Sequence, residues 1–339
     1  MKRFVFWTLT LVPALTLAAA ACYLVFLTNL PQLWYSSSIR NIFFDCLRFV
    51  PDDYVYTMKP GPCRVKNLEY DTVLTHDGDG FRNTNLPPSV DVAVLGDSFA
   101  HGIGVQDDET FTHRLASDYR YRVRNLAIGS YATMRELDVL ARHGRGATYV
   151  VLQYCSNDVM ENELSLTLDR RAFRSRVETW WRTFIATYDQ GKARGYGKPI
   201  GDLALMLKNG AYSSTTAWRT QMAIRDMPRE ASLVAGIMAR YQELLADKRL
   251  IILEASAWRS NSAAFEGAFA AELSRLPWLR FRTIDTASRL TREDYFFLDD
   301  HVNARGHRKL ASAIADTIAR WERADPARGR PERPRGQKS

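Results

Sequence analysis

The chain has 339 residues, enough for one large domain or two small ones with a sizeable core. Its 46% hydrophobic and 25% charged residues are typical of an ordinary globular protein. The net charge of +8 argues poorly for nucleic-acid binding, because half of it lies in residues 323–339, a Pro/Gly/Arg tail with six Lys or Arg against two acidic residues. We expect that basic tail to be disordered and solvated.

The N-terminus carries a long apolar segment, because residues 4–30 contain no charged side chain. As a helix this segment would be about 40 Å long, enough to cross a hydrocarbon core of ~30 Å. A cleaved signal peptide is the alternative, but "YLVFL" keeps the segment apolar past the small residues of "LAAAAC". We therefore expect a cytoplasmic stub and transmembrane anchor over residues 1–30 in the cytoplasmic membrane. Lys2 and Arg3 predict that the rest of the chain faces the periplasmic or extracytoplasmic side.

Residues 31–89 form a lead-in with turn signals at "KPGP" and "HDGDGFRN", which favour short strands and loops. Of the four cysteines, Cys46 and Cys63 lie in this segment, and an oxidising compartment would permit a bridge between them. Two unpaired cysteines fit the sequence equally well. No C-x-x-C spacing indicates a metal site.

From residue 90 the pattern changes to alternating strands and helices, and we expect a catalytic domain over residues 90–322 with a helical insertion at about 160–230. The expected strands are "DVAVLG", "YRVRNLA", "TYVVLQY", "RLIILEA" and "LRFRTID". The expected helices cover residues 109–119, 133–143, 230–247, 264–275 and 303–320. This alternation predicts an α/β fold whose parallel sheet is covered on both faces.

Four polar segments leave the carboxyl ends of these strands, where ligands bind in such sheets. Ser98 follows the first strand, "NLAIGS" the second and Asn157 the third, while "FFLDDHVNARGH" follows the last. Their convergence predicts one crevice.

Ser98, His301 and Asp299 are the residue types of a nucleophilic triad. A serine hydroxyl needs a neighbouring base, and Asp299, two residues before His301, can hold the other ring nitrogen of that histidine. His101 is closer to Ser98 in sequence, but we expect it to point away along the turn.

Oxyanion donors would be the Ser98 backbone N–H, a backbone N–H at Gly129 or Ser130, and the Asn157 side-chain amide. Taken singly, each residue has a simpler interpretation, for example Asp97 and Ser98 as a helix cap. Their joint placement at the right strand ends is what indicates a site.

With these residues in view, the chain resembles the SGNH/GDSL hydrolases, serine esterases and acyl-transferring enzymes with a flavodoxin-like sheet. "GDSFAHGIGV" is similar to the family's nucleophile block and "VRNLAIGSYAT" to the block whose glycine N–H serves the oxyanion hole. "VLQYCSND" matches the block that carries the Asn, and "LDDHVNARGH" the block that carries the Asp and His. The resemblance covers about residues 77–320, without the insertion, and implies a three-layer α/β/α sandwich.

Two departures concern the site. The family's second-block glycine often falls at the position of Ser130, with Gly129 just before it. The common acid lies three residues before the His, which is Leu298 here, so the shorter Asp-x-His spacing of some polysaccharide-acetylating members points to Asp299, with Asp300 as the alternative.

The resemblance implies a membrane-anchored serine esterase that removes acyl groups, most simply acetyl, from an envelope or exported glycan or from a small ester. An O-acetyltransferase that uses the same triad, served by a membrane-bound acyl donor protein, is the alternative. A non-catalytic glycan-binding protein is the second alternative. We expect no cofactor, no metal and no nucleic acid. The absence of G-x-S-x-G argues against an α/β-hydrolase, and "GIG" lacks the rest of a dinucleotide fingerprint.

Overall fold

A computed structural model describes residues 10–21, 43–66, 69–193, 225–257, 260–296 and 301–324. The chain divides into two compact units, one of residues 1–40 and 184–221 and the other of residues 41–183 and 222–339. In the first unit, residues 10–21 form a helix. The helices within the described ranges include none with the length and apolar character needed to cross a bilayer, and the expected anchor is described only over residues 10–21.

The second unit is built on a five-stranded parallel sheet with the order β6-β5-β7-β8-β9. In chain order this is 2-1-3-4-5, the flavodoxin-like arrangement. The strands are β5 (Val92–Leu95), β6 (Val123–Asn125), β7 (Tyr149–Tyr154), β8 (Arg249–Glu254) and β9 (Arg280–Ile284). Every residue of β5, β7 and β8 is buried, as expected for parallel strands covered on both faces. The predicted α/β class with a parallel central sheet is confirmed.

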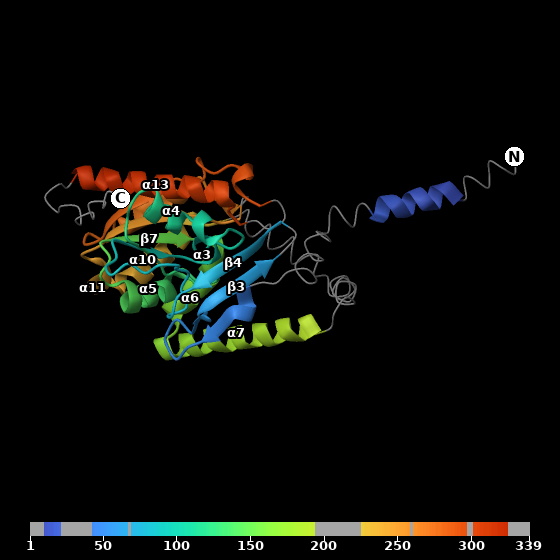
Figure 1. The fold of residues 1–339 in the computed structure, drawn as a ribbon, viewed down its shortest axis with the longest axis horizontal. Coiled ribbons are helices and arrows are strands. Elements are labelled where there is room, and N and C mark those ends of the chain that lie inside the picture. Colours follow the sequence, from blue (N-terminus) through green and yellow to red (C-terminus); the bar gives the residue numbers. More distant parts are fainter. Residues whose placement is uncertain are drawn as a thin grey trace, which may run out of the picture. The chain divides into compact units, whose positions relative to one another are not determined.

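Helices cover both faces of this sheet, and Figure 1 shows α13 and α4 on one side of β7 with α10 and α5 on the other. On one face, α4 and α13 share a core with alternate residues of the strands, such as Val94 and Val151. On the opposite face, Tyr154 packs its ring against Phe265 and Phe269 of α12. The α-helices are α3 (Ser98–His101), α4 (Phe111–Ser117), α5 (Thr133–Val139), α6 (Val159–Thr167), α7 (Arg170–Ala193), α10 (Met227–Ala239), α11 (Gln242–Leu245), α12 (Phe265–Leu273) and α13 (Ala304–Ala324).

Shorter helical turns complete the domain. In the part of the chain that the structure describes, four are 3-10 turns, η2 (Phe43–Cys46), η3 (Asp107–Glu109), η5 (Ser156–Asp158) and η8 (Arg292–Asp294), and η4 (Leu140–Gly144) is a π turn that continues α5.

The lead-in contains two antiparallel strand pairs. One joins β1 (Leu47–Phe49) to β2 (Tyr56–Met58), and the other joins β3 (Gly61–Lys66) to β4 (Asp71–His76). A disulfide joins Cys46, in the 3-10 turn directly before β1, to Cys63 in β3, which decides between the two cysteine interpretations left open by the sequence.

Two helices end at residues other than the sequence predicts, because side-chain contacts with other elements set their ends. The expected helix over 230–247 is broken between α10 and α11, where the Arg240 guanidinium binds carbonyls at the end of α6 and the Tyr241 hydroxyl binds Asp138. The last helix continues to Ala324, so the first two residues of the expected tail are helical. Its last turns are anchored by Trp321, whose ring lies 6.3 Å from that of Tyr149. The rest of the tail and residues 194–224 of the insertion lie outside the described residues.

Candidate active site

Ser98 and His301 meet at the carboxyl edge of the sheet. Ser98 begins α3 directly after β5, and its Oγ lies 2.8 Å from Nε2 of His301, although the two residues are 203 positions apart in the chain. Ser98 is nearly buried and keeps 9% of its surface exposed. The predicted nucleophile and the predicted base are therefore within hydrogen-bond distance.

Asp97 serves as the helix cap, the role that the sequence alone also offered to Ser98. Its Oδ1 accepts the Phe99 N–H at 2.9 Å, and its Oδ2 accepts from Nδ2 of Asn157 at 3.2 Å. Burial raises the pKa of Asp97, and these two hydrogen bonds and the nearby His301 oppose that rise. Because Asp97 supplies the cap, the Ser98 hydroxyl is left to His301.

The His301 backbone is fixed from both sides. Its carbonyl accepts the Phe296 N–H at 3.0 Å, and the next residue, Val302, forms a β-bridge with Tyr295. The His301 ring lies 4.7 Å from the Phe99 ring, centroid to centroid. The predicted acids Asp299 and Asp300 lie outside the described residues, so the assignment of the orienting acid stays a prediction.

The loop with Gly129 and Ser130 runs beside the nucleophile turn, because the Ile128 N–H donates to the Gly96 carbonyl at 3.2 Å. The hydroxyl of Tyr56 donates to the Gly129 carbonyl at 2.9 Å. In a trans peptide the carbonyl and the following N–H point in opposite directions, so this bond fixes the direction of the Ser130 N–H. Such fixed N–H groups are what an oxyanion hole requires, and the donor role of Gly129 or Ser130 remains a prediction.

Ser130 has a left-handed backbone, with φ of 64°, which is uncommon for a residue other than glycine. The Arg135 guanidinium donates to the Ser130 carbonyl and holds this conformation. Arg135 is fully buried, forms two 2.7 Å hydrogen bonds to Glu161, and lies 4.4 Å from the Tyr131 ring. Neither Arg135 nor Tyr56 stands in a motif block, so the sequence alone does not point to these two residues.

Two further carboxyls are buried near this site. Burial raises the pKa of Glu136 and of Asp158, and each rises further because of other acidic groups that include Asp97. The environment therefore favours the neutral form of Glu136, on α5, and of Asp158, in η5.

The remaining buried histidines do not face the nucleophile. Nε2 of His101 lies 3.0 Å from Nε2 of His76 in the lead-in, which agrees with the expectation that His101 points away from Ser98. Burial lowers the pKa of both, that of His76 to about 4. Nδ1 of His307 accepts the Phe111 N–H at 3.2 Å.

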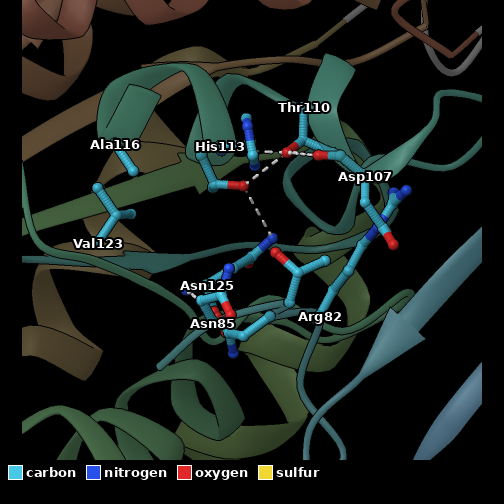
Figure 2. A pocket seen from close by; sticks show the side chains of 11 residues that line it. Arg82, Asn85, Asp107, Thr110, His113, Ala116, Val123 and Asn125 are labelled. Atoms are coloured by element: carbon cyan, nitrogen blue, oxygen red, sulfur yellow. Dashed lines mark hydrogen bonds and ion pairs between the residues drawn. The ribbon is translucent and has the colours of Figure 1, made fainter. Parts of the chain in front are cut away.

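A cavity of about 130 Å³ is lined in part by Arg82, Asp107 and Thr110, and its described lining residues do not include Ser98 or His301. Figure 2 shows its polar lining, in which Thr110 and Asn125 are bonded to neighbouring groups. The buried Arg82 guanidinium pairs with Asp107 at 2.8 Å and donates to the carbonyls of His101 and Val105. Through these bonds Arg82 and Asp107 hold the loop that follows α3 in place. Among the described residues no group of three His, Cys, Asp or Glu side chains is placed to hold a metal ion.

No protein-family model and no curated protein matches the sequence. Solved structures do match. A carbohydrate esterase family 2 enzyme with a carbohydrate-binding domain, from Corynascus thermopiles (Myceliophthora fergusii), is 13% identical over 76% of this chain and 72% of its own, with a TM-score of 0.40. A second carbohydrate esterase is 10% identical to this chain, over 70% of this chain and 67% of that protein, with a TM-score of 0.38. A lipase from a goat rumen metagenome is 13% identical to this chain, over 67% of this chain and 97% of the lipase, with a TM-score of 0.36. In its four motif blocks, its 2-1-3-4-5 parallel sheet and its paired serine and histidine, the chain resembles the SGNH/GDSL hydrolases.

Proposed function

We propose that this chain is a serine esterase of the SGNH type that hydrolyses ester-linked acyl groups, acetyl in the first place, on an envelope or exported glycan. The observation that carries the proposal is the 2.8 Å contact between Ser98 Oγ and His301 Nε2 at the carboxyl edge of a parallel sheet. A hydroxyl becomes an effective nucleophile when a base at this distance takes its proton.

In the proposed reaction, His301 Nε2 takes the Ser98 proton while Oγ attacks the ester carbonyl carbon. The tetrahedral intermediate collapses, and the alcohol leaves with the proton from His301. A water molecule, deprotonated by His301, then attacks the acyl carbon, and the carboxylic acid leaves as His301 returns the proton to Ser98 Oγ. Asp299 is the acid proposed to hold the other ring nitrogen of His301.

The proposed oxyanion donors are the N–H of Ser98, the N–H of Gly129 or Ser130, and the amide of Asn157. Asn157 is exposed and uses one amide hydrogen on Asp97. An amide nitrogen carries two hydrogens, so the second is available to the substrate oxygen. Each such donor stabilises a transition state by about 2.7–4 kcal/mol in enzymes where it has been removed.

The test compares the full-length protein with its Ser98→Ala variant on an activated acetyl ester and on an acetylated oligosaccharide, with released acetate as the readout. We expect kcat/KM of the variant to fall by roughly 10⁴- to 10⁶-fold, as for lost triad members elsewhere. The melting temperature should stay within about 1 °C, because Asp97 rather than Ser98 caps α3. Ser117→Ala, at the exposed end of α4, is the matched control and should keep full activity.

Equal activity of wild type and Ser98→Ala would refute the proposal, and so would two equally inert proteins. Adding a deacetylated oligosaccharide tests the alternative, because a transferase attaches the acyl group to a sugar hydroxyl at the expense of free acetate.

A further inference from the structure

A single amide side chain is buried in the middle strand of the sheet. β7 reads "YVVLQY", and Gln153 is 0% exposed among apolar and aromatic neighbours. Burying an amide is unfavourable unless its polar atoms are bonded, so a leucine or methionine would satisfy the core at this position. Packing alone therefore does not explain why a glutamine stands at this position.

Both polar atoms of Gln153 bind backbone next to the candidate site. Its Oε1 accepts the N–H of Asp97 at 3.1 Å and the N–H of Ala100 at 3.0 Å. Its Nε2 donates to the carbonyl of Ala255, the first residue after β8, at 2.9 Å. The two donors require the oxygen on one side and the carbonyl requires the nitrogen on the other, so the amide fits in one orientation only.

The two N–H groups that Gln153 holds lie on either side of Ser98 in the chain. Ser98 begins a helix of only four residues, too short to hold its shape through its own hydrogen bonds. Gln153 thus supplies an acceptor that the short helix lacks, and it ties the nucleophile turn to the ends of β7 and β8.

Gly96 makes room for this contact. Its φ is 148°, and a Cβ built there would lie 2.5 Å from Gln153 Oε1 and 2.7 Å from Ala100 Cβ. Any larger residue would push the amide and the turn apart, so glycine at 96 and glutamine at 153 form one fitted pair.

We infer that Gln153 is a positioning residue for the nucleophile. It fixes the turn over residues 97–100, and through that turn it sets Ser98 Oγ against His301 Nε2 and aims the Ser98 N–H. The expected loss of kcat rests on the proposed esterase function. The expected loosening of the turn rests on the hydrogen bonds alone.

The experiment compares full-length wild type, Gln153→Met and Leu152→Ala. Gln153→Met keeps the length of the side chain and removes its hydrogen bonds. Leu152→Ala is the matched control, since it opens a cavity at the next residue of β7, on the opposite face of the sheet. The readouts are kcat and KM on an activated acetyl ester, the melting temperature, and amide hydrogen exchange at residues 97–100 and 92–95.

For Gln153→Met we expect kcat to fall by about 10²-fold with KM changed by less than about threefold, the cost of a nucleophile displaced by about 1 Å. The amides of Asp97 and Ala100 should exchange about tenfold faster or more, while those of β5 stay protected. Leu152→Ala should lower the melting temperature at least as much, yet keep kcat within about threefold of wild type.

A kcat of Gln153→Met within about threefold of wild type, or unchanged exchange at Asp97 and Ala100, would overturn the inference. Equal losses of kcat in both variants would overturn it too, since they would show a general effect of stability. Gln153→Glu keeps an acceptor oxygen and should recover part of the lost rate. If the methionine variant does not fold, Gln153→Leu, which also removes the hydrogen bonds, takes its place. Were wild type itself inert on every ester, the esterase proposal would fail, and the exchange data alone would still decide whether Gln153 fixes the turn.

Discussion

Gly129 lies where Phe43 of the lead-in packs closely against the loop beside the nucleophile. A Cβ built on Gly129 would lie 2.5 Å from the Phe43 ring, which is itself buried. Any side chain at 129 must therefore displace either the ring or the loop that carries the candidate oxyanion donor.

We expect Gly129→Ala to lower kcat by about 10²-fold, the effect of losing one oxyanion donor, with a smaller change in KM. Gly267→Ala is the matched control, because it stands inside α12 and, apart from its chain neighbours and the backbone of its own helix, no described atom lies within 4 Å of its built Cβ. Steady-state kinetics on an acetyl ester measure both variants. Adding Phe43→Leu to Gly129→Ala should recover part of the rate, and a double variant no faster than Gly129→Ala would exclude the steric explanation.

His307 gives the stability of the protein a pH-dependent part. Burial lowers its pKa to about 3, against an ordinary value near 6.5, with Arg82 and His301 adding to the effect. Between these two pH values the unfolded chain binds a proton that the folded chain does not, so stability is lost as pH falls.

We expect the difference in unfolding free energy between wild type and His307→Asn to change by about 2 kcal/mol from pH 7.5 to pH 5, with wild type losing more. Asparagine offers an acceptor for the Phe111 N–H and does not titrate. Urea unfolding at the two pH values measures this, and the buried carboxyls are common to both proteins, so their contribution cancels. Parallel pH profiles would mean that His307 stays neutral in the unfolded chain or charged in the folded one.

At the scale of elements, the Cys46–Cys63 disulfide joins the end of η2, directly before β1, to β3 across a sequence separation of 17 residues. A bridge that closes a loop of this size stabilises a fold by about 3 kcal/mol, chiefly by restricting the unfolded chain. The same segment carries Tyr56 and Phe43, which hold the loop over residues 129–130.

We therefore expect the double variant Cys46→Ala, Cys63→Ala to lose about 3 kcal/mol of unfolding free energy in denaturant titrations. Reductant should bring wild type to the level of the variant and leave the variant unchanged. Equal stability of the oxidised wild type and the variant would show that strain in the native bridge offsets its entropic benefit.

The elements also show what the sequence could predict. The strands of the sheet were predictable because β5, β7 and β8 are largely apolar runs, a pattern typical of strands buried on both faces. The break between α10 and α11 was not, because it depends on bonds from Arg240 and Tyr241 to distant elements. The pairing within the lead-in and its disulfide likewise depend on tertiary contacts that local residue patterns do not encode.

For the candidate site, the pairing of Ser98 with His301 could be predicted, since the carboxyl ends of parallel strands share one edge. Gln153 could have been found from the sequence, because it is a lone amide in the otherwise apolar run "VVLQY". Arg135 could not, because its contact with Ser130 follows from the conformation of a loop rather than from a residue pattern.

At the scale of the whole molecule, nucleophile and base belong to the same unit but stand 203 residues apart in the chain. A ribosome adding about 5–20 residues per second needs roughly 10–40 s to pass from one to the other. Throughout that interval the growing polypeptide carries a serine without its base. Under the proposed function, the chain therefore stays inert toward esters while it is being made, because Ser98 gains its base only after His301 has been synthesised and packed.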